Sequence, residues 1–181
     1  MDRPLDARRN KTIKELVLKG ERMKKGDFVE FLKTDLELCF FAVRQYSDYA
    51  DRLGEMKGTQ LDQLLKVVAS QERDNAFIIA EFIRRLGGNP GDYTGRGVTY
   101  GNLVELLFHS FLGEQEAIER YSQRKRQAEG LGELELAGAL GNIIRTEEEH
   151  VHIFKEALAQ RLVITSGPPM EGAGYSECIA L

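Results

Sequence analysis

The sequence predicts an all-α protein, a bundle of four helices in which a long crossover joins the second helix to the third. After residue 27, apolar residues recur at intervals of three and four along four separate stretches, as they do in helices that bury one face. Glycines stand between these stretches and end the helical pattern. The three links are short, long and short in that order, and their lengths decide how the helices pair.

The first two predicted helices form one pair. We expect the first to begin at Asp27, a residue type that caps helix N-termini, and to end at Gly54. The second covers Leu61–Leu86 and is closed by Gly87-Gly88. Its predicted apolar stripe consists of Leu61, Leu64, Leu65, Val68, Ala76, Ile79, Phe82, Ile83 and Leu86. Because the link at residues 54–59 is short, these helices should be antiparallel neighbours.

The third and fourth predicted helices form the other pair. The third begins near Val98 to Asn102 and ends near Gly130, and the fourth follows a short link and runs to Leu162. The link after Gly87 has about 12 to 14 residues, which at about 3.3 Å each span the roughly 40 Å length of a helix of about 27 residues. This link can therefore act as a crossover that makes the second and third helices parallel.

Composition excludes several classes of protein. The chain has 181 residues, 25 Lys or Arg against 29 Asp or Glu, a formal net charge of −4 and a pI of about 5.5, which argues against a nucleic-acid partner. Hydrophobic residues make up 42%, enough for one folded core. Cys39 and Cys178 form no C-x-x-C pair, which excludes a disulfide scaffold. Without a long apolar run or a signal-like N-terminus, we expect a soluble, cytoplasmic protein.

Charge and composition divide the chain into three parts. Residues 1–26 hold nine Lys or Arg against four Asp or Glu and predict a basic arm or a short helix. Residues 27–163 form the bundle, and residues 164–181 form a flexible tail rich in glycine and proline. The final Cys178-Ile179-Ala180-Leu181 matches a prenylation signal, which would bring the protein to a membrane. Alternatively, the tail docks on a partner protein, or it is an ordinary tail.

Acidic residues interrupt three of the apolar stripes near the middle of their helices. Glu72, Glu114 and Glu147 each have apolar residues three or four positions before and after them. Three residues after Glu72 comes Asn75, and three after Glu147 comes His150. In a bundle these positions should converge at one level. Glu116, Glu148 and Glu149 on the same helices are expected at the surface, and His109 and His152 either at the surface or behind the residues that meet at this level.

Such a convergence requires a cation. Three carboxylates buried together repel one another, and burial disfavours their charged forms. The stripes of these three helices offer no Lys or Arg, since Arg73 and Arg145 point off the apolar face. A Glu-x-x-His sequence offers a carboxylate and an imidazole from one helical turn to the same metal. We therefore predict a metal site formed by the three acids and His150, although a single Glu in a stripe more often marks a helix end or an interface.

These residues lie in motifs that resemble the ferritin-like superfamily, in its bacterioferritin and rubrerythrin-like branch, over residues 28–162. The stretch Ala42-Val43-Arg44-Gln45-Tyr46 resembles the end of the first-helix motif of that family. Arg145-Thr146-Glu147-Glu148-Glu149-His150 resembles its fourth-helix motif. The intervals of 26 residues from Tyr46 to Glu72 and of 33 from Glu114 to Glu147 agree with the family as well.

The resemblance implies a centre with six ligand positions for two metals, and two of these positions are changed here. Cys39 stands where the first-helix Glu is expected, and Asn75 stands where the second-helix His is expected. Both losses fall on the same metal, which implies a depleted centre for a single ion, iron or alternatively Mn or Zn. A second site would have to use Cys39, Asn75 or Asp35, one helical turn before Cys39. Alternatively, Cys39 is a small core residue.

For the remaining metal, the resemblance implies Glu114 and His150 as terminal ligands, with Glu72 and Glu147 in the bridging positions. It implies a role in iron handling or oxidative-stress protection and a homo-oligomer, a dimer or larger. An enzyme of this kind would be a ferroxidase or an oxidoreductase that uses O2 or peroxide. The alternatives are a di-iron oxidase or oxygenase with an unusual second site, and a catalytically inactive structural subunit. No haem is expected, because the haem-binding Met of bacterioferritins would fall near Arg73.

Overall fold

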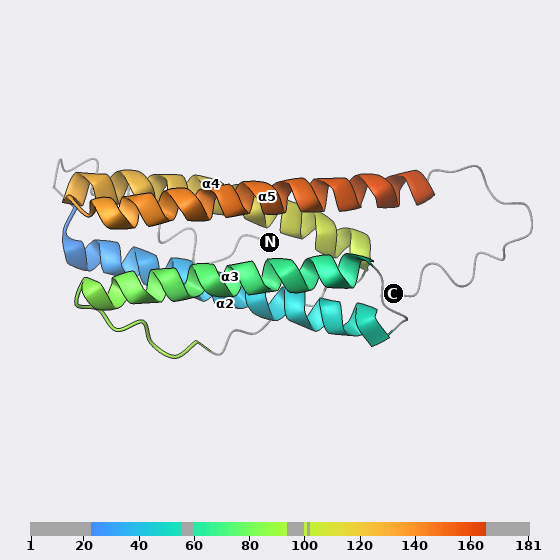
Figure 1. The fold of residues 1–181 in the computed structure, drawn as a ribbon, viewed down its shortest axis with the longest axis horizontal. Coiled ribbons are helices and arrows are strands. Elements are labelled where there is room, and N and C mark those ends of the chain that lie inside the picture. Colours follow the sequence, from blue (N-terminus) through green and yellow to red (C-terminus); the bar gives the residue numbers. More distant parts are fainter. Residues whose placement is uncertain (1–22, 56–59, 94–99, 101, 166–181) are drawn as a thin grey trace, which may run out of the picture.

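The computed structural model describes residues 23–55, 60–93, 100 and 102–165 of the chain. Within these residues it contains four helices and no strand: α2 (Lys25–Glu55), α3 (Gln60–Arg85), α4 (Leu103–Leu131) and α5 (Leu134–Thr165) (Figure 1). The prediction of an all-α four-helix bundle is confirmed. The predicted basic arm, apart from its last four residues, and nearly all of the C-terminal tail with Cys178 lie outside the described residues.

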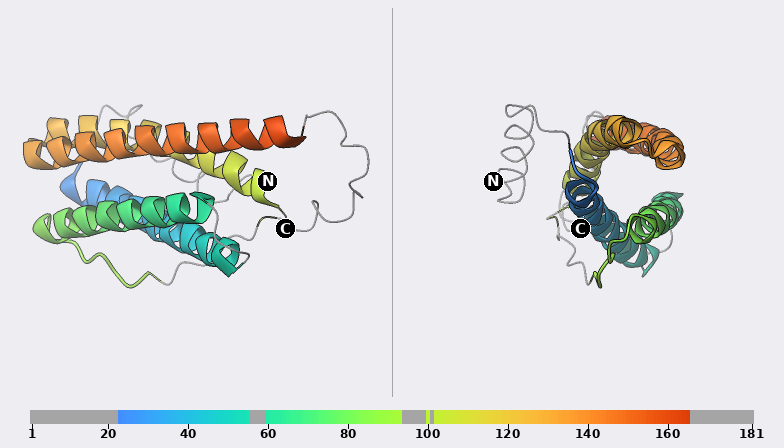
Figure 2. Two further views of the ribbon diagram at one scale, coloured as in Figure 1. Left: turned by 45° about the vertical axis from the view of Figure 1, so that its right-hand side comes forward. Right: turned by 90° about the vertical axis from the view of Figure 1, so that its left-hand side faces the viewer.

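The four helices pack as two hairpins. The main helix contacts are those of α2 with α3 and of α4 with α5, and fewer contacts join the two hairpins. Figure 1 shows that α3 ends and α4 begins at opposite ends of the bundle, so that these two helices run in the same direction. The end-on view in Figure 2 shows the α2–α3 hairpin on one side of the bundle and the α4–α5 hairpin on the other. The predicted crossover between the second and third helices is therefore confirmed.

Local signals explain where the helices begin and end. Asn102 caps α4, because its side-chain oxygen accepts a hydrogen bond from the Glu105 backbone N–H at 2.9 Å. Gly132 ends α4 with a φ of 80°, a left-handed conformation that favours glycine and allows the tight turn into α5. The start of α2 differs from the prediction: the helix begins at Lys25, and Asp27 lies in its first turn, where a negative charge suits the helix dipole.

Buried apolar side chains gather in two clusters, one toward each end of the bundle. The first contains residues such as Leu32, Ile83 and Leu140, and the second residues such as Leu65 and Phe154. On α3, α4 and α5 the two clusters are separated by one level of buried polar side chains. The interruptions in the apolar stripes therefore correspond to a polar layer between two apolar cores.

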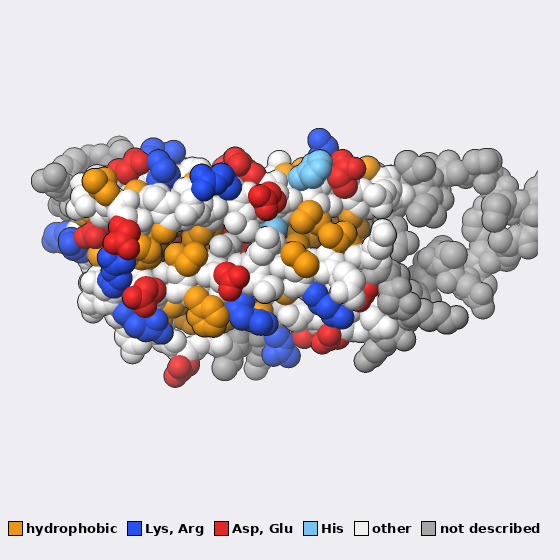
Figure 3. Space-filling model, viewed as in Figure 1, with side chains coloured by type: hydrophobic (Ala, Val, Ile, Leu, Met, Phe, Trp, Pro, Cys, Tyr) orange, Lys and Arg blue, Asp and Glu red, His pale blue; other side chains and the backbone are white. Residues whose placement is uncertain are grey.

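The outer surface carries mixed charges. Figure 3 shows acidic and basic side chains interspersed over the face formed by α3 and α5, with hydrophobic side chains between them. Leu64, predicted in the apolar stripe of α3, is 39% exposed, because it lies at the edge of the face that Leu61 and Leu65 turn to the core. None of the described helices combines the length and the apolar character needed to span a bilayer.

Candidate metal centre

Four buried side chains from three helices meet in the polar layer. Glu72 comes from α3, Glu114 from α4, and Glu147 and His150 from successive turns of α5. Each is at most 4% exposed, and one ligand atom from each lies within 4.8 Å of those of the other three. The structure thus brings together the four residues that the broken stripes singled out. The sequence places them there because each occupies a core-facing position of its helix.

His150 is held at both ring nitrogens. Its Nδ1 lies 3.1 Å from Glu147 Oε2 and 3.4 Å from Glu72 Oε1. Its Nε2 lies 3.0 Å from Gln71 Oε1. Because a carbonyl oxygen accepts hydrogen bonds, Nε2 carries a proton, and Nδ1 is the nitrogen that faces the carboxylates.

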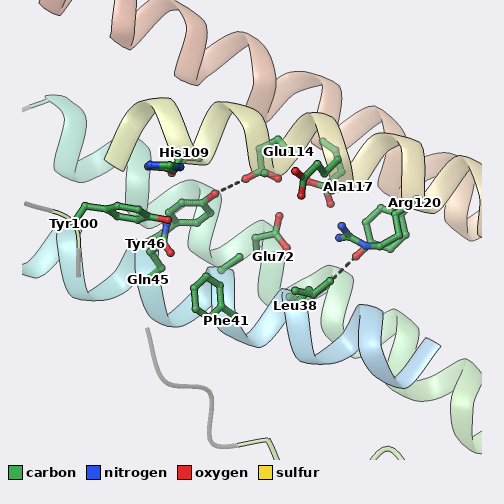
Figure 4. A pocket seen from close by; sticks show the side chains of 17 residues that line it. Leu38, Phe41, Gln45, Tyr46, Glu72, Tyr100, His109, Glu114, Ala117 and Arg120 are labelled. Carbon is green, nitrogen blue, oxygen red and sulfur yellow. Dashed lines mark hydrogen bonds between the residues drawn. The ribbon is translucent and has the colours of Figure 1, made fainter. Parts of the chain in front are cut away.

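Two further side chains orient the carboxylates. The Tyr46 hydroxyl of α2 donates a hydrogen bond of 2.5 Å to Glu114 Oε1, which Figure 4 marks with a dashed line. Asn75 Nδ2 donates a hydrogen bond of 3.1 Å to Glu147 Oε1. Asn75 therefore lies within the polar layer, as its spacing from Glu72 predicts, but it contributes a donor to the cluster. The Nδ2 group positions the carboxylate and has no lone pair for a metal, which in Asn75 only Oδ1 could supply.

Burial changes the acidity of the cluster. It raises the pKa of Glu114 from 4.5 to about 8 and that of Glu147 to about 7, and a neighbouring carboxylate adds to each shift. Burial also raises the pKa of Glu72. For His150, burial lowers the pKa, but hydrogen bonds to Glu147 and Glu72 outweigh it and raise the pKa to about 10. Without a metal the cluster therefore binds protons, which a cation would displace.

The donor set fits one divalent ion. Three carboxylates and one imidazole are the ligands of Fe(II), Mn(II) and Zn(II) sites, and all four are within reach of a single cation. Within the described part of the chain, the group of side chains able to bind one ion contains neither Cys39 nor Asp35. The residues present can therefore hold a metal ion.

The Cys39 side chain contacts Tyr121 and is not part of the four-residue group. It is 2% exposed on α2, and its Sγ lies 3.1 Å from the hydroxyl of Tyr121 on α4. Burial, with a smaller effect of the Glu72 charge, raises the pKa of the Cys39 thiol well above its ordinary value. Without a metal this thiol is therefore protonated, and Tyr121 is its hydrogen-bond partner.

Asp35 faces arginines rather than the acid cluster. Its carboxylate lies 2.6 Å from Arg124 Nε and 3.2 Å from Arg120 Nε, so it is not placed to replace the missing carboxylate. Arg124 is 2% exposed, and the expectation that no basic residue interrupts the stripes of α3, α4 and α5 was wrong. The signal was present in the sequence, because Tyr121, Arg124 and Ala128 share one face at intervals of three and four.

A cavity of about 90 Å³ lies between α2 and α4, beside the cluster (Figure 4). Exposed residues of α4, among them Gly113 and Glu116, line it at the surface, and Glu72, Glu114 and Glu147 line its buried part. Leu38, Phe41 and Ala42 of α2 form an apolar wall. The cavity thus joins the solvent to the cluster on the side where Cys39 stands.

Five further titratable residues of α4 and α5 lie at the surface. His109, His152, Glu116, Glu148 and Glu149 are all exposed. His109 stacks on Tyr100, with 4.9 Å between the ring centroids, and lines the cavity near its opening. Gln71 was not foreseen, because the residue that it contacts, His150, lies 79 positions away in the sequence.

Comparison with known proteins extends these observations. The Ferritin-like domain family matches residues 29–162. A bacterioferritin of Desulfovibrio desulfuricans is 27% identical over 133 residues, which cover 73% of this chain and 74% of that protein.

Solved structures are similar as well. The X-ray structure of the Desulfovibrio desulfuricans bacterioferritin, which describes its diiron site in different catalytic states, has a TM-score of 0.72 at 23% identity and covers 84% of this chain and 94% of its own. A ferritin-like, diiron-carboxylate protein from Bacillus anthracis has a TM-score of 0.64 at 29% identity and covers 75% of this chain and 99% of its own. Because the family match spans most of the chain and includes all four helices, this protein belongs to the ferritin-like domain family.

Proposed function

We propose that this protein binds one iron ion per chain at a depleted ferritin-like centre and acts in iron handling or oxidative-stress protection. The observation that carries the proposal is the single group formed by Glu72, Glu114, Glu147 and His150, with one ligand atom of each within 4.8 Å of the others. The structural relatives named for diiron sites support iron as the ion. The engagement of Cys39 by Tyr121 supports a single ion.

The four side chains would divide the work of binding. Glu114 and His150 would be terminal ligands of the ion, and His150 would bind through Nδ1 while its Nε2–H donates a hydrogen bond to Gln71 Oε1. Glu72 of α3 and Glu147 of α5 would supply further carboxylate oxygens. When bound, iron supplies the exchange of single electrons with dioxygen or peroxide. Tyr46 would hold Glu114 in place, and the apolar walls of the cavity would limit the entry of water.

Metal analysis of the purified protein tests the proposal. We expect about one equivalent of iron per chain, with anomalous scattering at the iron and zinc edges to identify the ion. Glu114→Ala and His150→Ala should each lose the metal, because each removes a terminal ligand. The matched controls Glu116→Ala and His152→Ala change exposed residues of the same helices and should keep it. Unchanged metal content in both ligand variants would contradict the assignment.

The stoichiometry also separates the alternatives. Two equivalents of iron, together with O2-dependent oxidation of Fe(II), would support a di-iron oxidase or oxygenase with an unusual second site. Protein that binds no metal, even after reconstitution with Fe(II) and removal of excess ion, would support a structural subunit.

A double variant tests why the second ion is missing. Cys39→Glu with Asn75→His restores the two ligand types that the family resemblance places at these positions. We expect the double variant to bind a second equivalent of metal, measured by metal analysis after reconstitution. Asn75→His alone should not, because a single added imidazole leaves the second position without its own carboxylate. If the double variant gains no metal while its helical content is unchanged, the ligand positions are assigned wrongly.

A further inference from the structure

Cys39 and Tyr121 form a buried pair beside the candidate metal centre. The Cys39 Sγ and the Tyr121 hydroxyl are 3.1 Å apart, and the two residues are 2% and 1% exposed. They come from α2 and α4, and both line the same cavity as Glu72, Glu114 and Glu147. Metal binding by the four-residue group uses neither of them.

We propose that Cys39 and Tyr121 are a modification site, at which oxidation joins Sγ to the ring carbon next to the phenol hydroxyl as a thioether cross-link. The inference rests on the proposed function, because iron at the four-residue centre is needed to activate the oxidant. The S–H bond of Cys39 and one ring C–H bond of Tyr121 break, and the C–S bond forms. Two electrons and two protons pass to dioxygen, which becomes hydrogen peroxide, and the iron is unchanged overall.

The contact geometry selects these two residues. The hydrogen bond places the sulfur beside the hydroxyl edge of the ring, and the carbons that react in an oxidised phenol are two bonds from that oxygen. Tyr46, the other tyrosine that lines the cavity beside the acids, has its hydroxyl on Glu114 and not on a sulfur. The two reacting side chains are therefore already in contact.

The electron count favours an oxidisable pair at this position. Reduction of dioxygen to peroxide takes two electrons, whereas one Fe(II) ion gives one. Within the described residues the metal-binding group offers a place for one ion, so a second iron is not at hand to supply the other electron. Cys39 stands where the sequence resemblance places a ligand of that second ion, and with Tyr121 it can supply both electrons.

The cavity gives a small oxidant access to the pair. Its volume of about 90 Å³ suits a molecule as small as dioxygen, and its lining includes Cys39, Tyr121 and the three acids. Exposed residues of α4, such as Gly113, line its outer part. A molecule that enters between α2 and α4 therefore reaches the metal centre and the sulfur in the same space.

Mass spectrometry of the full chain tests the proposal. Protein carrying Cys178→Ser, so that Cys39 is its one thiol, is loaded with Fe(II) without oxygen and then exposed to air. We expect its intact mass to fall by two hydrogen atoms and its thiol content in denaturant to fall from one per chain to none. After proteolysis, a peptide that contains Cys39 should be joined to one that contains Tyr121.

Variants locate the bond. Cys39→Ser and Tyr121→Phe, in the same background, should show no loss of hydrogen, because each lacks one reacting group. Tyr49→Phe is the matched control: it removes the hydroxyl of another buried tyrosine, which contacts Tyr100, and it should cross-link like the parent. The peptide map of the parent protein decides the question even if a variant fails to fold.

The metal content of each sample is measured in parallel. Bound iron with an unchanged mass and a free Cys39 thiol after exposure to air would overturn the cross-link and leave the proposed function standing. A gain of oxygen on Cys39, or a loss of hydrogen mapped to other residues, would also overturn it. Absence of both iron and cross-link would overturn the two proposals together.

Discussion

Gln71 carries no charge and no predicted role, yet it determines which nitrogen of His150 faces the acids. Its amide oxygen accepts a hydrogen bond from the Nε2–H of His150, with 3.0 Å between Nε2 and Oε1, which leaves Nδ1 directed at Glu147 and Glu72. Histidine ligands in metal sites commonly have such a partner on the far nitrogen, and its loss weakens metal binding. The contact is a feature of tertiary structure, since the two residues lie on different helices.

Replacement of Gln71 by leucine should weaken metal binding by about 10-fold to 100-fold, because the imidazole is then free to rotate and to change its protonated nitrogen. Gln71→Glu keeps an acceptor oxygen for the Nε2 proton and should largely restore the affinity. Competition between the protein and a fluorescent chelator for Mn(II) or Zn(II) measures both. Equal affinities for the parent and the leucine variant would show that Gln71 does not position His150.

The residues of the centre differ in how far the sequence could predict them. Glu72, Glu114 and Glu147 could be found because a charged residue in an apolar stripe breaks a periodic pattern. Gln71 and Tyr121 break no pattern, and their importance comes from contacts across helices. Asp35 shows what residue spacing cannot predict. It is buried, as its position in α2 predicts, but its carboxylate forms ion pairs with two arginines of α4 and does not join the acid cluster.

At the scale of helices, the ion pair of Asp35 with Arg124 links α2 and α4, two helices that belong to different hairpins. The backbones of α2 and α3, and those of α4 and α5, lie close together over much of their length, whereas the backbones of α2 and α4 come close at few points. Asp35 of α2 is fully buried between Arg120 and Arg124 of α4. The pair therefore holds the two hairpins together beside the cavity.

Asp35→Ala should lower the free energy of unfolding by about 3 to 5 kcal/mol, because it leaves Arg124 buried without its carboxylate. The matched control is Asp48→Ala, which removes an exposed ion pair with Arg44 within α2 and should cost less than about 1 kcal/mol. Urea unfolding followed by circular dichroism measures both. Similar losses for the two variants would show that the buried pair has no special role in the stability of the bundle.

The helices themselves were largely predictable, because apolar periodicity and glycine positions are local signals. The prediction of the crossover was correct as well, since the link after Gly87 is long enough to span the bundle. The start of α2 was predicted two residues late, because Asp27 is a strong cap type but the chain already turns into the helix at Lys25. Cap residues show where a helix can begin, and the tertiary structure decides where it does.

At the scale of the whole molecule, the net charge of −4 does not show how the charged residues divide between the surface and the interior. Three acids lie in a buried layer between two apolar clusters, and burial raises the pKa of each of them. The apolar clusters stabilise the bundle, and the layer between them makes its stability depend on pH and on metal. Fold and site are therefore coupled through the same four side chains.

Without metal, the free energy of unfolding should fall as the pH rises from about 5 to about 8. The folded-state pKa is raised for Glu147 to about 7, for Glu114 to about 8 and for His150 to about 10. A raised pKa stabilises the fold fully below the unfolded value, and this contribution is lost as the pH passes the folded value. With Mn(II) present the trend should reverse, because the ion binds the deprotonated ligands more tightly at higher pH.

Urea unfolding at several pH values, with a chelator or with Mn(II), measures the two slopes. Glu114→Gln should flatten the metal-free slope, because it removes the group that loses its proton near pH 8. Glu148→Gln, an exposed change on the same helix as Glu147, should leave the slope as it is. If the parent and Glu114→Gln have the same slope, the pH dependence arises outside the cluster. A reversal by Mn(II) in the parent that is lost in Glu114→Gln would tie both effects to one buried layer of ligands.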